Sequence, residues 1–84
     1  GYATEAARES LAFGFRRLRL DEVVSFTATV NQPSRAVMER IGMRNTHGDF
    51  EHPAVPPGHV LRPHCLYRIT RDEWEAGEER SPNR

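Results

Sequence analysis

The first four residues, Gly1-Tyr2-Ala3-Thr4, have the composition of an anion-binding turn. They lead directly into an amphipathic helical pattern, so the free N–H groups of a helix start stand next to a glycine. Such N–H groups, together with the partial positive charge of the helix dipole, favour phosphate. An ordinary turn before a helix would have the same sequence, and residues alone leave both interpretations open. If the turn binds phosphate, the chain starts inside it, and we expect that the strand leading into it is missing.

Four histidines and the only cysteine could suggest a metal site, since all five fall within nineteen positions (His47, His52, His59, His64 and Cys65). Structural zinc sites usually show closely spaced ligand pairs such as C-x-x-C or H-x-x-x-H, and this segment has none. We therefore predict no metal. A histidine of the proline-rich segment could act as a base, because its pKa lies near neutrality. Cys65 lies in a predicted strand beside Leu66 and Tyr67 and is predicted to be a packing residue rather than a nucleophile.

A helix and a strand are predicted in the first thirty residues. Apolar side chains recur at steps of three and four from Tyr2 to Leu18, which indicates a helix with one apolar face (Ala3, Ala7, Leu11, Phe15 and Leu18). The segment Glu22–Val30 is rich in β-branched and aromatic residues and is typical of a strand. Alternation would place Val24, Phe26, Ala28 and Val30 on one face, and Ser25, Thr27 and Thr29 on the other.

A short second helix is predicted where that strand ends. Pro33 suits the first helical turn, and Asn31 is a better capping residue than Gln32. An apolar face follows (Val37, Met38 and Ile41), and Gly42 ends the helix in the left-handed conformation.

The remaining elements are less regular. We expect a weak strand over 43–50, a proline-rich loop over 51–63 and a clearer strand over 64–70. The pattern Thr70-x-x-Glu73 resembles a capping box that opens a short helix through Trp74. The domain is expected to cover residues 1–76, and the charged segment 77–84 to form a flexible tail.

Composition narrows the class of protein. Eighty-four residues allow one domain at most. Twelve basic residues balance twelve acidic ones, and a net charge of zero argues against binding to nucleic acid or to an anionic membrane. One cysteine cannot form an internal disulfide, which favours a reducing, cytoplasmic location. No stretch approaches the roughly 18 apolar residues of a membrane helix.

Three segments, in this order, resemble the carboxy-terminal half of the GNAT superfamily of acyl-CoA N-acyltransferases. Gly1-Tyr2-Ala3 is similar to the end of the family's pyrophosphate motif, (Q/R)-x-x-G-x-(G/A), whose leading residues would lie upstream. The second segment, Asn31-x-x-Ser34-x-x-Val37-Met38-Glu39-x-Ile41-Gly42-Met43, resembles that of the ribosomal-protein N-terminal acetyltransferase branch, with Arg40 for the usual lysine and Met43 for the usual phenylalanine. The third, His64-x-x-Tyr67-Arg68-Ile69-Thr70-x-x-Glu73-Trp74, resembles that branch's last strand and closing helix.

The resemblance implies a mixed α/β fold, namely a partial GNAT domain with a three-stranded sheet whose last strand lies between the other two. It implies that the family's first four strands and first two helices are missing. It also implies acetyl-CoA as co-substrate, held by Gly1, Tyr2, Ala3, Thr4 and Asn31. Ser34 is the candidate catalytic residue, because similar enzymes place a tyrosine on this helix or a serine near its start, and this helix has no tyrosine. Its hydroxyl would stabilise the departing thiolate, although a first-turn serine can also serve only as part of the helix cap.

The expected function is therefore part of an N-acetyltransferase that acts on a primary amine, with little or no activity in the isolated chain. His52 and His59 could border the acceptor pocket. Arg35 and Arg40 could reach the phosphates of coenzyme A, or form a solvated helix face. The alternative is a non-catalytic interaction module. Its exposed strand edge would form a homodimer or bind a complementing amino-terminal half.

Overall fold

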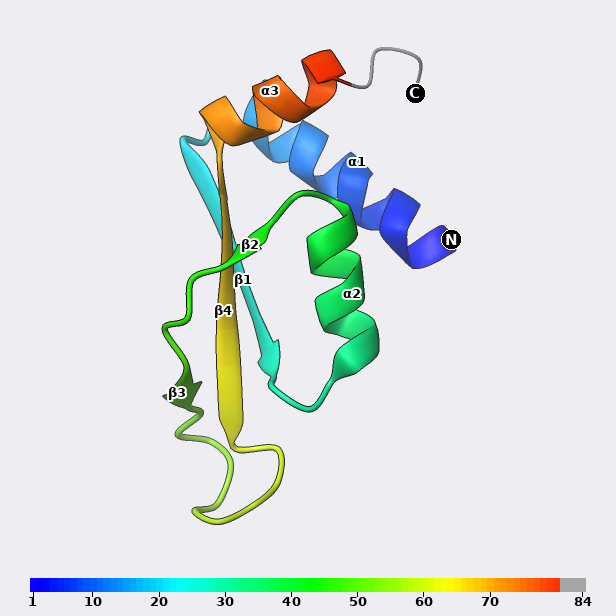
Figure 1. Ribbon diagram of the computed structural model, residues 1–84. Helices are drawn as coiled ribbons and strands as arrows, with labels where there is room; N and C mark the ends of the chain where they lie inside the picture. Colours follow the sequence, from blue (N-terminus) through cyan, green and yellow to red (C-terminus); the bar gives the residue numbers. More distant parts are fainter. Residues whose placement is uncertain (81–84) are drawn as a thin grey trace.

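The computed structural model describes residues 1–80 as an antiparallel sheet with helices packed against it (Figure 1). In chain order the elements are α1 (Tyr2–Arg16), β1 (Glu22–Ala28), α2 (Gln32–Arg40), β2 (Arg44–Asn45), β3 (Phe50–Glu51), β4 (Pro63–Thr70) and α3 (Arg71–Arg80). None of the helices within this range is both long and apolar enough to cross a membrane.

The last strand, β4, is the centre of the sheet, as the family resemblance implies. The order is β1-β4-β2, and β3 also pairs with β4. The sheet thus has four strands rather than the expected three. The weak strand expected over 43–50 is interrupted because His47 adopts a left-handed backbone (φ 61°), held by its N–H donating to Asn45 Oδ1 at 2.8 Å.

The core lies between β4 and the helices. Alternate residues of β4 are buried, namely Cys65, Tyr67 and Ile69. Against them pack Leu11 and Phe15 from α1, Met38 from α2, and Met43. Trp74 of α3 stacks on Phe15 with ring centroids 5.2 Å apart, so α3 closes the same core. Both α1 and α2 therefore lie on the face of the sheet from which these side chains project.

The two faces of β1 alternate as predicted, but the more apolar face is the exposed one. Val24 and Phe26 are 52% and 53% exposed, whereas Ser25 and Thr27 are partly covered. The register explains this, because Thr27 pairs with Cys65 and directly opposite residues share a face. Val30 does not belong to this strand, which ends at Ala28 before a turn.

Two helix ends differ from the sequence prediction. Helix α1 ends at Arg16, not Leu18, because the N–H groups of Arg17 and Leu18 both donate to Phe13 O. Helix α3 continues past Trp74 to Arg80, with an ion pair of 3.1 Å from Arg16 to Glu78. Of the segment expected to form a tail, residues 77–80 thus continue α3, and 81–84 lie outside the described residues.

Candidate functional site

The start of α1 offers free backbone N–H groups to solvent. Gly1 is the N-cap, and no described side chain accepts a hydrogen bond there. The first N–H groups of any helix lack intrahelical partners, so those of this turn remain available for an anion. A Cβ built on Gly1 would meet nothing within 4 Å, which shows open space beside the turn. Gly1, Tyr2 and Ala3 are exposed, whereas the Thr4 side chain is buried at 5% exposure.

The start of α2 is capped as the sequence predicts. Asn31 Oδ1 accepts a hydrogen bond from the Ser34 N–H at 3.2 Å, and Pro33 occupies the first turn. This bond uses the amide oxygen and leaves the Asn31 NH₂ group as a donor. Ser34 is half-buried, so its hydroxyl lies at the edge of the protein interior.

A pocket of about 360 Å³ lies between the amino-terminal half of α1 and the length of α2 with the turn that follows it. Ala3 and Ala7 of α1 and Ser34 of α2 are among the residues that line it. The complete lining adds Ser25 of β1 and the α2 side with its following turn (Pro33, Val37, Met38, Ile41 and Met43). The structure therefore brings Ala3 and Ser34 to one pocket, while the other predicted site residues do not line it.

The pocket has a chemistry that suits an extended, mostly uncharged chain. Its walls are largely aliphatic, and the hydroxyl-bearing residues Ser25 and Ser34 supply the polar groups. Ser25 was not singled out from the sequence. The alternation of β1 does separate it from Phe26, but only the packing of both helices shows that its face borders a pocket.

The Arg35 side chain is partly buried and makes hydrogen bonds within the protein. Its Nη1 donates to Thr29 O at 2.9 Å, and its Nε donates to the Tyr67 hydroxyl at 3.3 Å. Tyr67 in turn donates to Glu39 Oε2 at 2.6 Å. The hydrogen bond to Glu39 raises the pKa of Tyr67, and the hydrogen bond to Tyr67 raises the pKa of Arg35. Arg40, by contrast, has an exposed side chain.

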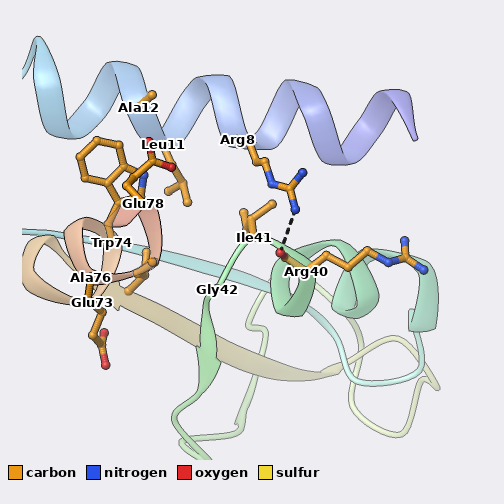
Figure 2. A pocket seen from close by; sticks show the side chains of 12 residues that line it. Arg8, Leu11, Ala12, Arg40, Ile41, Gly42, Glu73, Trp74, Ala76 and Glu78 are labelled. Carbon is orange, nitrogen blue, oxygen red and sulfur yellow. Dashed lines mark hydrogen bonds between the residues drawn. The ribbon is translucent and has the colours of Figure 1, made fainter. Parts of the chain in front are cut away.

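A second pocket, of about 460 Å³, lies between α1, α3 and the end of α2 (Figure 2). Three charged side chains at its rim already have partners. Arg8 donates to Arg40 O at 3.3 Å, Glu73 pairs with Arg44, and Glu78 pairs with Arg16. Trp74 uses one ring face against Phe15 and also lies beneath the Arg16 guanidinium, 5.1 Å from the ring centroid. The lining includes Arg40, a candidate contact for the phosphates of coenzyme A, but none of the other predicted site residues.

Two of the histidines lie together on the outer face of the sheet. The rings of His52 and His64 are 4.9 Å apart, and Phe26 and Phe50 pack beside them. Within residues 1–80, no group of three or more His, Cys, Asp or Glu side chains is arranged to hold a metal ion. Cys65 is 1% exposed in the core, which fits a packing residue.

Comparison with known proteins points to one family. The sequence profile described as "Acetyltransferase (GNAT) domain" matches residues 1–44. FsC-acetyl coenzyme A-N(2)-transacetylase of Aspergillus fumigatus is 40% identical over 74 residues, which are 88% of this chain and 32% of that protein. The uncharacterized N-acetyltransferase YnaD of Bacillus subtilis is 36% identical over 88% of this chain and 42% of its own length.

Solved structures agree with the sequence matches. A GNAT-family acetyltransferase from Bacillus anthracis superposes with a TM-score of 0.72 at 36% identity, covering 86% of this chain and 42% of the other. A spermidine/spermine N-acetyltransferase from Vibrio cholerae gives a TM-score of 0.78 at 17% identity, covering 92% of this chain and 45% of the other, which shows a shared fold. The chain thus spans about a third to a half of the proteins it matches. More than half of its residues fit the family profile, and the chain belongs to the GNAT family of acetyltransferases.

Proposed function

We propose that this chain is the carboxy-terminal half of an acetyl-CoA-dependent N-acetyltransferase that modifies a primary amine. The observation that carries the proposal is the pocket between α1 and α2, whose lining includes both Ala3 and Ser34. The motif spacing around Asn31 and Ser34 supports the ribosomal-protein N-terminal acetyltransferase branch within the family. Residues 1–76 would form the domain, and a single unpaired cysteine favours a cytoplasmic location.

In this proposal the starts of α1 and α2 bind different parts of coenzyme A. The N–H groups at Gly1 to Thr4 would hold the pyrophosphate, because they have no side-chain cap and lie at the positive end of α1. Tyr2 is 90% exposed and could pack beside the nucleotide. The NH₂ group of Asn31 would donate to the amide-containing arm of coenzyme A while its oxygen caps α2. The aliphatic walls of the pocket would exclude water from that arm.

Coenzyme A supplies the reactive thioester, and the protein contributes mainly by positioning the reactants. The amine nitrogen would attack the thioester carbonyl, and the C–S bond would break when the tetrahedral intermediate collapses, with the amine proton released to solvent. The Ser34 hydroxyl would donate a hydrogen bond to the departing thiolate sulfur. A serine hydroxyl is a poor acid, so this role is electrostatic stabilisation rather than proton transfer. His52 and His59 belong to the segment after β2 and would be available to an acceptor there.

Titration of the isotope-labelled chain with coenzyme A tests this proposal. We expect amide chemical-shift changes at Gly1 to Thr4, Asn31 and Ser34. Ser34→Ala should reduce the response, whereas Ser10→Ala, an exposed serine farther along α1, should leave it unchanged. An acetyl-transfer assay with the isolated chain should give little or no product, since the chain spans only about a third to a half of the proteins it matches. Absence of any shift at these amides would refute the proposed site.

The alternative function is an interaction module, and the sheet gives a specific reason to keep it. β1 is an edge strand that pairs with β4 on one side, and its outer face carries the exposed Val24 and Phe26. Such an edge can receive another strand, either from a second copy or from a complementing amino-terminal half. Concentration-dependent sedimentation without a response to coenzyme A would favour this alternative.

A further inference from the structure

One side chain, Arg35, connects the loop between β1 and α2 to the centre of the sheet. Its guanidinium donates both to Thr29 O (2.9 Å) and to the hydroxyl of Tyr67 (3.3 Å), a residue of β4. The hydroxyl of Tyr67 in turn donates to Glu39 Oε2 at 2.6 Å. Glu39 lies one helical turn after Arg35 on α2. Arg35, Tyr67 and Glu39 are called here the α2 clamp.

The three side chains of the α2 clamp hold one another in a fixed arrangement. Tyr67 has no exposed surface, so its ring cannot move without opening the core. The planar guanidinium holds two donors in a rigid fork, which a lysine cannot reproduce. Both hydrogen bonds of the Tyr67 hydroxyl involve a charged partner, and the one to Glu39, at 2.6 Å, is as short as charge-assisted bonds usually are. That bond raises the pKa of Tyr67, and the hydrogen bond to Tyr67 raises the pKa of Arg35.

The loop held by the α2 clamp is the one that presents Asn31. Arg35 fixes it from two directions, since its side chain holds Thr29 O and its own N–H donates to Asn31 O at 3.1 Å. Between these points the chain makes a tight turn. The Asn31 N–H donates a hydrogen bond to Ala28 O (2.9 Å), and the Gln32 N–H donates one to Val30 O (3.0 Å). A shift of Arg35 would therefore change the direction of the Asn31 side chain and of the first turn of α2.

We propose that Arg35 is a positioning residue, held by Tyr67 and Glu39, that fixes the loop before α2 so that Asn31 and Ser34 take up their orientation beside the pocket. This inference rests on the proposed function, because the orientation of Asn31 and Ser34 affects binding only if these residues contact coenzyme A. The Arg35 side chain itself is engaged with protein groups, so it acts through Asn31 and Ser34 rather than on a ligand.

Arg35→Met removes both side-chain hydrogen bonds and keeps most of the length of the side chain. Its control is Arg17→Met, an exposed arginine directly after α1 that is not a candidate contact for coenzyme A. The measurements are amide hydrogen exchange of the whole chain and its affinity for coenzyme A by chemical-shift titration. In Arg35→Met we expect exchange about tenfold faster at Asn31, Gln32 and Ser34, unchanged exchange in β4, and affinity about tenfold weaker. Arg17→Met should match the wild-type chain in both.

Tyr67→Phe and Glu39→Gln keep the test decisive if Arg35→Met folds poorly. Tyr67→Phe deletes one hydroxyl without changing the core volume, and it should accelerate exchange at the same three amides about threefold. Glu39→Gln retains an acceptor oxygen for Tyr67 and should behave nearly as wild type.

Equal acceleration at the loop and in β4 would mean a general loss of stability and would overturn the positioning role. No acceleration at the loop would overturn it as well. If the wild-type chain does not respond to coenzyme A, the proposed function fails, while hydrogen exchange still decides the role of Arg35.

Discussion

The clearest test of the site separates the two roles assigned to Asn31. Its side-chain oxygen caps α2, while its NH₂ group is proposed to contact coenzyme A. Asn31→Ala removes both groups. Asn31→Asp keeps an oxygen acceptor for the Ser34 N–H but removes the donor and adds a negative charge.

The expected magnitudes differ for stability and for binding. The capping bond is 3.2 Å long and exposed, so Asn31→Ala should cost about 1 kcal/mol of unfolding free energy, typical of a lost cap. Asn31→Asp should cost a few tenths of a kcal/mol at most, because aspartate is an equally good cap and interacts favourably with the helix dipole. Both variants should weaken coenzyme A binding, roughly tenfold for a lost hydrogen bond of about 1.4 kcal/mol. The aspartate variant should be the weaker binder, because its charge repels an anionic ligand.

Urea denaturation and chemical-shift titration on the same samples would measure the two effects. An Asn31→Asp chain that is stable yet binds coenzyme A as well as wild type would refute a contact by the NH₂ group. An Asn31→Asp chain as unstable as Asn31→Ala would show instead that the cap depends on more than an acceptor oxygen.

Three further predictions concern the elements that position the site. Thr70→Ala should cost about 1 kcal/mol, and about 4–8 °C of melting temperature by calorimetry, because Thr70 Oγ1 accepts from the Glu73 N–H at 3.2 Å in a capping box. The hydrogen bond from the Thr70 N–H, and then Arg44, lower the pKa of Glu73 below its usual value of 4.5. The ionised Glu73 carboxylate therefore stabilises the folded chain fully above pH 4.5, and this stabilisation is lost as the pH falls through the lower pKa of the folded state. Glu73→Gln should therefore be less stable than wild type at pH 7, and urea titrations should show the difference disappearing at acid pH. Phe15→Ala should cost about 3–5 kcal/mol, whereas Phe26→Ser on the exposed sheet face should cost less than about 1 kcal/mol; similar losses in the two denaturation curves would contradict the observed burial.

Local chemistry made several features predictable from the sequence. Asn31 followed by Pro33 indicated the start of α2, and the structure confirms that cap. Gly42 ends the helix with φ 96°, as expected of a left-handed residue. The Thr70-x-x-Glu73 pattern gives both hydrogen bonds of a capping box. Each of these features depends on residues within four positions of one another, so no knowledge of distant packing is needed.

Features that depend on distant residues were not predictable in the same way. Composition does not reveal that Ser25 and Thr27, rather than Val24 and Phe26, face the helices. That choice is made by the register with β4, which sets Thr27 opposite Cys65. Arg35 is an equally clear case. Next to Ser34 in a polar first turn, an arginine is typical of a solvated face. Only the folded chain brings Thr29 O and the Tyr67 hydroxyl to its guanidinium.

Binding and acetyl transfer make different demands on this chain, and the structure indicates how far each is met. The groups proposed to bind coenzyme A lie at two helix starts, and both helices contribute side chains to one buried core with β4. Those groups are therefore held rigidly by contacts within residues 1–80, and a measurable affinity is expected of the isolated chain. Transfer also needs an acceptor amine held within attacking distance of the thioester. Among the described residues β1 is an edge strand, to which a second polypeptide could add the groups that hold the acceptor. A second polypeptide that pairs with β1 should accordingly raise the rate of transfer far more than it raises the affinity for coenzyme A. An equal gain in rate and affinity would argue instead that the added strand completes the binding site itself.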